Sequence, residues 1–169
     1  MIQPDAGEVE IGETIRIGYF AQEVPDMDTN QRVIDYIRDV AEYIPTRDGK
    51  ISATMMLERF LFDSAMQYAP IAKLSGGEKR RLYLLKVLME APNVLLLDEP
   101  SNDLDIPTLT ILEDYLDSFA GIVIAVSHDR YFLDNIVDRI FAFEGNGHLT
   151  QYEGGYTDYT EALARKGGA

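Results

Sequence analysis

Two adjacent carboxylates follow an apolar run in the middle of the chain. Residues 94–97 are Val-Leu-Leu-Leu, and Asp98, Glu99 and Pro100 come next. Such a run predicts a buried strand, and in open α/β sheets ligands bind outside the carboxyl ends of the strands. Asp98 is suited there to hold Mg²⁺, and Glu99 to orient or deprotonate a water that attacks a phosphate. Two solvated carboxylates at a strand end explain this segment equally well.

A serine and two glycines begin a predicted helix. Ser75 is a good N-cap, and Gly76 and Gly77 let the backbone approach a ligand closely. Free N–H groups and the helix dipole favour an anion at such a terminus. A simple cap without a ligand is the alternative.

His128 and Gln22 each follow a predicted strand. A neutral imidazole at His128 can hydrogen-bond a γ-phosphate or hold the attacking water, and a Gln22 amide can contact Mg²⁺ or water. Taken alone, each is more simply a surface or capping residue.

Short apolar strands alternate with helices after Pro92. We predict strands over residues 93–97, 121–126 and 139–143, helices over 106–118 and 128–135, and a strand followed by a helix over 149–164. This alternation favours a parallel sheet with crossover helices.

The first half of the chain is predicted to be mainly helical. Residues 8–20 alternate and turn at Gly12-Glu13, which predicts a β-hairpin. From about residue 29 to 89 the apolar spacing is helical. The apolar positions of the three predicted helices are Val33, Ile34, Ile37 and Val40, then Met55, Met56, Phe60 and Phe62, then Leu82, Leu85, Leu88 and Met89.

Length and composition narrow the class of protein. The 169 residues suffice for one domain with a core, and the absence of cysteine excludes disulfides and thiolate metal sites. The apolar runs are shorter than the roughly 18 residues that span a membrane. No signal-peptide pattern begins the chain. We therefore expect a cytoplasmic protein.

Charge disfavours nucleic acid overall but not everywhere. The net charge of −14 repels a polyanion on average. Between Lys73 and Lys86 five basic residues stand against one acid, Glu78, a local net of +4. This run is either a solvated helix face or a face that meets an anionic ligand or nucleic acid.

The motifs together resemble those of the ATP-binding-cassette (ABC) ATPases. Gln22 matches the Q-loop, residues 74–78 the LSGG signature, residues 98–99 the Walker B strand end with its catalytic glutamate, residues 101–105 the D-loop and His128 the switch histidine. Five motifs in this order make the resemblance specific, and it covers essentially the whole chain.

The resemblance implies ATP and Mg²⁺ as cofactors and assigns roles to residues. It implies that Glu99 and His128 are catalytic, and that Asp98 and Gln22 hold the metal. The residues implied to contact the nucleotide site are Gln22, Ser75, Gly76, Gly77, Glu78, Asp98 and Asp105.

Three segments resemble the ABC-F branch of that family: residues 102–105, residues 127–134, and residues 152–156 with Tyr159. Ser101 replaces the usual Thr of that branch and keeps the hydroxyl. ABC-F members are soluble proteins with two cassettes and no membrane domain, and several act on the ribosome. The implied partners are a second cassette and, through regions outside this chain, the ribosome or RNA; no membrane domain is expected.

The implied fold is α/β, a P-loop NTPase-like parallel sheet with a helical subdomain, truncated at the N-terminus. Residues 1–26 are expected to form the end of the ATP-binding core with the Q-loop. Residues 27–90 are expected to form the helical subdomain that ends in the signature helix. Residues 91–165 are expected to form the RecA-like core with Walker B, D-loop and switch histidine.

The phosphate-binding loop is missing from this sequence. That loop needs Gly-x-x-x-x-Gly-Lys-Ser/Thr. The single Gly-Lys is Gly49-Lys50, but Ile51 follows it and Ile44 occupies the position of the first glycine. We interpret Met1 as a truncated or artificial start, with the motif upstream, and expect the chain alone to be inactive.

The missing segment also implies a missing strand. In the family that this chain resembles, the Walker A strand lies between the strands matching residues 121–126 and 139–143. Each of these is therefore expected to have an unpaired edge. The apolar residues expected to be exposed there are Ile122, Val123, Ile124, Ile140 and Phe141.

Three other functions compete with an ABC-F ATPase. A transporter cassette would couple to a membrane domain through residues 27–72, which give no decisive sign. A chromosome-maintenance ATPase splits its cassette by a coiled coil, whereas Gln22 and the signature here share one chain without a preceding heptad run. A non-enzymatic module that kept the motifs by descent is the third alternative.

Overall fold

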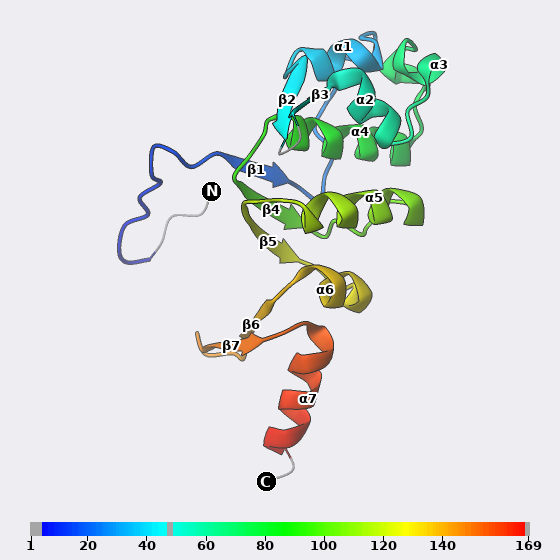
Figure 1. Ribbon diagram of the computed structural model, residues 1–169. Coiled ribbons are helices and arrows are strands. Elements are labelled where there is room, and N and C mark those ends of the chain that lie inside the picture. The colour runs from blue at the N-terminus through cyan, green and yellow to red at the C-terminus, as the bar shows by residue number, and fades with distance from the viewer. Residues whose placement is uncertain (1–4, 47–48, 168–169) are drawn as a thin grey trace.

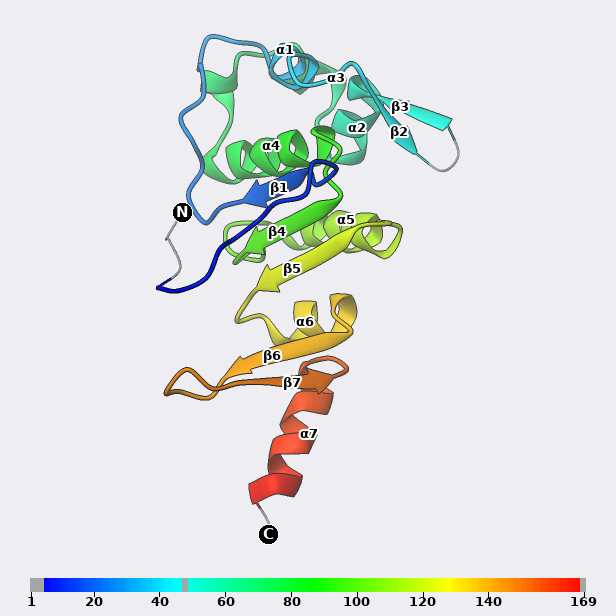
Figure 2. The same cartoon turned by 90° about the vertical axis from the view of Figure 1, so that its left-hand side faces the viewer.

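The computed structural model describes residues 5–46 and 49–167 and has an α/β architecture. Its main sheet contains three parallel strands in the order β1-β4-β5, which are Ile17–Phe20, Val94–Asp98 and Ile122–Val126. Tyr19 pairs with Leu96, and Asp98 pairs with Val126. The carboxyl ends of all three strands therefore meet at one edge, as Figure 2 shows.

Helices cover one side of this sheet (Figures 1 and 2). They are α4 (Gly76–Met89), which packs against β1, α5 (Ile106–Asp117) and α6 (Arg130–Ile136). A side-chain cap begins each of them, from Ser75, Asp105 and Asp129 respectively. These caps accept hydrogen bonds from N–H groups that have no partner within the helix, so they fix where each helix leaves its loop.

A helical unit lies beyond α4. It contains α1 (Val33–Arg38), α2 (Ala53–Arg59), α3 (Ser64–Gln67) and the 3₁₀ turn η1 (Ile71–Lys73). Between α1 and α2 the chain forms an antiparallel hairpin of β2 (Tyr43–Thr46) and β3 (Gly49–Ser52). The uniformly helical prediction for this region missed the hairpin. It also extended α2 too far, because Phe60 and Phe62 follow the helix and are buried in the core.

The hairpin predicted over residues 8–20 is wrong. Residues 8–16 form no strand beyond a turn, in which the Ile15 N–H donates to the Gly12 carbonyl at 3.0 Å. Only Ile17–Phe20 are extended, and they pair in parallel with β4. Pairing with a buried strand buries Phe20, whereas Val9 and Ile11 stay exposed because no apolar surface packs against them.

The C-terminal part forms a separate two-stranded sheet. β6 (Arg139–Phe143) and β7 (Leu149–Glu153) are antiparallel, and α7 (Tyr156–Gly167) packs on β7. Two hydrogen bonds join this part to α6, because Asp134 accepts from the backbone N–H and the hydroxyl of Thr157 at 2.7 Å each. These bonds also lower the pKa of Asp134, the backbone bond most.

Unpaired edges are present where the sequence predicts them. β5 pairs only with β4, and β6 only with β7, among the strands of the described residues. Ile122 is 61% exposed, and Ile124 and Phe141 are each 55% exposed. Val123 and Ile140 are half-buried instead, because alternate residues of these strands face the helices.

The structure confirms the α/β fold class with a parallel sheet. Residues 1–4, which begin the unit predicted over 1–26, lie outside the described residues. Across the two described ranges no helix is both long enough and apolar enough to cross a membrane.

We predict that the isolated chain self-associates through these edges, because unpaired backbone groups beside exposed apolar side chains template further pairing. Light scattering should give a mass above the 19.0 kDa monomer, rising with concentration. Ile124→Lys should reduce association, whereas Met55→Lys, an equally exposed position on α2, should not. A monodisperse monomer that unfolds cooperatively would contradict the prediction.

Candidate functional site

Asp98 and Glu99 lie at the carboxyl end of the central strand. Asp98 is the last residue of β4, and its Oδ2 accepts a hydrogen bond from the Tyr19 hydroxyl at 3.2 Å. This bond, together with some burial and the negative charge, raises the pKa of Tyr19. Tyr19 was not predicted from the sequence to belong to the site, and it reaches Asp98 because β1 and β4 run in parallel.

Glu99 makes a strained turn directly after the strand. Its φ is 48°, in the left-handed region that non-glycine residues rarely adopt, and the residue is only 8% exposed. Its N–H donates to the Val126 carbonyl at 2.8 Å, which continues the β4–β5 ladder by one bond. Backbone strain of this kind persists where surrounding bonds impose it, and it clusters at functional sites.

His128 holds the Glu99 carboxylate. The His128 N–H donates to Oε2 at 3.2 Å, and Nε2 lies 3.3 Å from Oε1. The imidazole itself is 97% exposed. The two predicted catalytic residues are thus in contact, with the carboxylate buried and the imidazole open to solvent.

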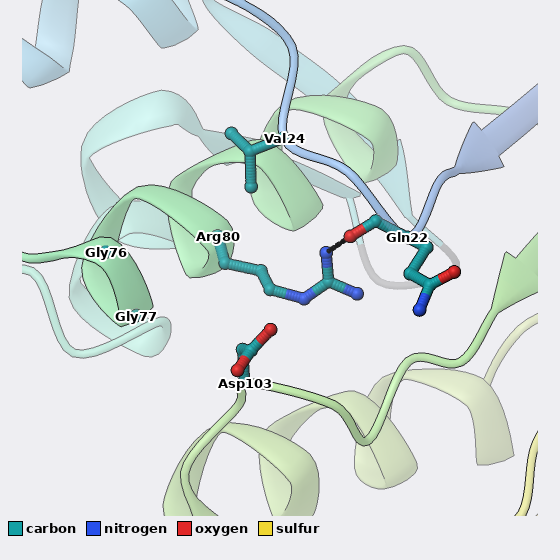
Figure 3. Close-up of a pocket in the computed structure, with 6 residues that line it drawn as sticks. All are labelled: Gln22, Val24, Gly76, Gly77, Arg80 and Asp103. Carbon is teal, nitrogen blue, oxygen red and sulfur yellow. Dashed lines mark hydrogen bonds between the residues drawn. The ribbon is translucent and has the colours of Figure 1, made fainter.

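Gln22 joins this group through its backbone. It follows β1, and its carbonyl accepts a hydrogen bond from Nη1 of Arg80 in α4 (Figure 3). Arg80 also donates to the Glu99 carbonyl at 3.3 Å. One side chain therefore connects the loop that carries Gln22 with the loop that carries Glu99.

Ser75 and Glu78 form a closed capping box at the start of α4. Ser75 Oγ accepts from the Glu78 N–H at 3.3 Å, while Glu78 Oε2 accepts from the Ser75 N–H at 2.7 Å and the Ser75 hydroxyl at 2.8 Å. These bonds, the backbone one first, lower the pKa of Glu78. Both side chains are committed to the helix terminus, and Gly76 and Gly77 are exposed.

An open cavity of about 370 Å³ separates this terminus from Gln22. Figure 3 shows Gly76 and Gly77 on one side and Gln22 on the other, with the Arg80 side chain extending between them and Asp103 below it. Asp98, Glu99 and His128 are not among the residues that line this cavity.

Asp105 serves as a helix cap in this chain. Its Oδ1 accepts from the Thr108 N–H at 3.0 Å, and its Oδ2 lies 3.5 Å from Arg81 Nη1. The Thr108 side chain contributes most to lowering the pKa of Asp105, ahead of the backbone bonds and Arg81.

Two of the five cations in the basic run of residues 73–86 do not belong to a solvated face, whereas Lys73 is exposed and Lys79 and Lys86 are half-buried. Arg80 and Arg81 are buried and bonded within the chain, Arg81 to Asp105 and Thr108. The sequence contains a sign that Arg80 is buried, because Arg80 precedes Leu84 and Leu88 by four and eight residues, the spacing of one helix face. That face packs inward.

The donor set suits a hard cation with few protein ligands. Asp98 offers a carboxylate, and Tyr19, whose hydroxyl bonds to that carboxylate, offers a phenol oxygen. Gln22, three residues after Tyr19 in the sequence, offers an amide oxygen. Within the described residues no cluster of three or more His, Asp or Glu side chains could enclose a metal. Mg²⁺ is commonly bound by one or two carboxylates and completed by substrate phosphates and waters, so the residues fit it.

Comparison with known proteins identifies relatives of the chain. The family described as ABC transporter matches residues 2–102, more than half of the 169 residues. The ATP-binding protein YfmR of Bacillus subtilis is 58% identical over 96% of this chain and 26% of its own length. The translational throttle protein EttA of Escherichia coli K12 is 37% identical over 99% of this chain and 30% of its own length. The chain thus spans roughly a quarter to a third of these relatives.

Solved structures share the fold. The archaeal recycling factor aABCE1, in complex with the stalk protein aP1, aligns with a TM-score of 0.69 at 20% identity over 96% of this chain and 32% of its own. A dimeric ATP-binding cassette in a post-hydrolysis state, with ADP and phosphate, aligns with a TM-score of 0.57 at 20% identity over 82% of this chain and 63% of its own.

The capping box predicts a pH-dependent contribution to stability. Ser75→Ala should lower the free energy of unfolding by about 0.5–2 kcal/mol at neutral pH, the range for loss of a serine N-cap. Because folding lowers the pKa of Glu78, its contribution is present above about pH 4.3, the ordinary value for Glu, and is lost as pH falls through the folded value.

Urea unfolding of the wild type and of Glu78→Gln at several pH values measures the contribution of the Glu78 charge to the free energy of unfolding. The difference between the two should shrink on acidification. Ser118→Ala, which removes an exposed hydroxyl outside any N-cap, is the control and should change little. A difference between the wild type and Glu78→Gln that stays constant from neutral pH to pH about 3 would show that the charge of Glu78 does not stabilise the helix.

Proposed function

Because the chain belongs to the ATP-binding-cassette family, in the ABC-F branch of Uup and EttA, we propose that it forms the metal- and water-binding part of an ATP-hydrolysing site. The observation that carries this proposal is the pair of contacts from His128 to the buried carboxylate of Glu99, beside Asp98. A buried, doubly held carboxylate at a strand end is oriented before any ligand arrives.

Each residue has a separate role in this proposal. Asp98 and Gln22 hold Mg²⁺, which when bound neutralises charge on the phosphates of ATP. Glu99 orients a water and accepts its proton, and His128 keeps the Glu99 carboxylate in position and meets the terminal phosphate. Asp105 caps α5 and lines a pocket together with Ser75, Gly77 and Glu78 of the signature terminus.

The signature terminus acts on a second cassette. Gly76 and Gly77 line a cavity together with Gln22, and Ser75 and Glu78 line a second pocket with Asp105. Glu99 and His128 line neither of these two pockets. We infer that this helix end closes against the nucleotide of an opposing cassette, and that the partner's helix end closes against this one. The dimeric ADP-bound cassette that shares the fold supports such an arrangement.

The proposed division of the chain follows from these roles. Residues 1–26 and 91–165 belong to the ATP-binding core, and residues 27–90 to the helical unit that ends in the signature helix. β1 precedes the helical unit in the sequence and β4 and β5 follow it, yet all three strands belong to one sheet, which supports this division.

The proposed cellular role is in translation, on the ribosome and in the cytoplasm. The relative EttA is named as an energy-dependent translational throttle. The structural neighbour aABCE1 is named as a ribosome recycling factor. The identity of 37–39% with EttA favours this role over a transporter cassette, which is the second candidate.

We predict that the chain alone does not bind ATP tightly. Its sequence contains no phosphate-binding loop, so it lacks both the backbone cradle and the lysine that bind the β- and γ-phosphates. Calorimetric titration with Mg-ATP should give no binding in the micromolar range. A micromolar dissociation constant would mean that other residues of this chain form a phosphate site.

In the natural full-length protein that contains this chain, Glu99→Gln should retain ATP binding and slow hydrolysis by about 10²–10⁴-fold. The reason is that the amide keeps the shape of Glu99 but cannot accept a proton. Steady-state phosphate release and nucleotide binding measure the two effects, with Glu144→Gln, in the turn between β6 and β7, as a control. Unchanged turnover in Glu99→Gln would remove Glu99 from the mechanism.

A further inference from the structure

Arg80 donates hydrogen bonds to four main-chain carbonyls from two loops, the one after β1 and the one after β4. Its Nη1 donates to Ala21 at 3.3 Å and to Gln22, its Nη2 to Glu99 at 3.3 Å and its Nε to Asn102 at 2.7 Å. The guanidinium carbon also lies 4.6 Å from the centre of the Phe20 ring. The loop after β1, the loop after β4 and the start of α4 therefore converge on one group.

Burial makes these bonds difficult to break. Arg80 is 2% exposed, and burial is the largest influence on its pKa, which it lowers against the raising effect of Asp103. The charge is offset by carbonyl dipoles and by the face of Phe20 rather than by a bonded carboxylate. A buried cation that loses such acceptors keeps its desolvation penalty, so neither loop can move away without disturbing Arg80.

The planar shape of the group determines what it can couple. A guanidinium presents five N–H donors in a rigid fork, so moving one acceptor tilts the donors that face the others. The acceptors include Gln22 and Glu99, the residues proposed to contact metal and water. A shift of the Gln22 loop is thereby transmitted to the Glu99 loop.

We propose that Arg80 is a positioning residue that couples the Gln22 loop to the Glu99 loop and to α4. This inference rests on the proposed ATPase function. Arg80 touches no reacting atom; it sets the distance between the metal ligand, the catalytic carboxylate and the helix that faces the second cassette. Turnover then depends on the correct relative positions of Gln22, Glu99 and the start of α4.

The neighbouring Arg81 provides a matched comparison. It is also buried on α4, but its contacts are Asp105 and Thr108, and the Phe62 ring at 4.9 Å. It therefore joins α4 to α5 and to the helical unit. Loss of Arg81 should disturb the chain near residue 105 and leave the Gln22 loop unchanged.

Hydrogen exchange on the chain itself tests the coupling. Arg80→Gln should speed exchange of amides in both residues 21–24 and residues 99–103 by about tenfold or more, since bonds to a charged group are lost. Arg81→Gln should speed exchange only around residues 105–108. Loosening of one loop without the other, or the same pattern in both variants, would overturn the proposal.

The kcat and KM of the natural full-length protein distinguish a positioning role of Arg80 from a purely structural one. Arg80→Ala should lower kcat by about 10²-fold, as expected for a misplacement of roughly 1 Å, with KM for ATP nearly unchanged. Because Arg80 lines the open cavity, added guanidinium ion should enter and restore part of the lost turnover, whereas sodium chloride at equal ionic strength should not. Arg80→Lys should remain impaired, since an ammonium cannot span both loops.

Two controls separate the possible failures. Arg38→Ala, at an exposed arginine paired with Glu42, should leave kcat unchanged. If Glu99→Gln hydrolyses ATP normally, the proposed function fails, and the hydrogen-exchange experiment alone then tests whether Arg80 couples the two loops. If Glu99→Gln is inactive but Arg80→Ala raises KM as much as it lowers kcat, or gains nothing from guanidinium, Arg80 is not the positioning residue.

Discussion

Parallel pairing of β4 with β1 on one side and β5 on the other is the constraint on which the site depends. Because the three strands run in the same direction and in close register, Tyr19, Asp98 and the residues after Val126 end at one edge. Glu99 then takes a left-handed turn whose N–H still bonds to β5. The sheet therefore places the acidic residues, and the strain at Glu99 is maintained by the strand beside it.

The packing is uneven along the chain, and this unevenness separates two mechanical parts. Most of the fully buried side chains belong to residues 20–97, from the helical unit, α4 and the inner face of β1 and β4. Beyond β5, buried side chains are few, Phe132 and Tyr152 among them, and polar contacts such as Asp134 to Thr157 join the elements. The site lies where the densely packed part meets the loosely packed part, so its loops can be firmly anchored on one side and open on the other.

Sequence patterns predicted the elements whose signals are local. The strands at 94–98 and 139–143 and the start of α4 at Ser75 follow from apolar runs and a capping residue, and the family resemblance located the unpaired edges. Features that depend on distant pairing were missed. The Tyr19–Asp98 bond joins residues 79 apart in sequence, and the four acceptors of Arg80 come from loops that only the fold brings together. The β2–β3 hairpin escaped notice because Pro45 and the helical spacing around it conceal two short strands.

The Tyr19–Asp98 hydrogen bond gives this chain an optical property. The sequence has ten tyrosines and no tryptophan, so phenols dominate its ultraviolet emission. A phenol that donates to a carboxylate emits weakly, because the excited hydroxyl passes its proton to the oxygen. Tyr19 is therefore a quenched chromophore while it is bonded to Asp98. A cation that binds the Asp98 oxygen and not the Tyr19 oxygen frees the hydroxyl and brightens the emission of this one tyrosine, so the molecule carries an unlabelled indicator of binding at this strand end.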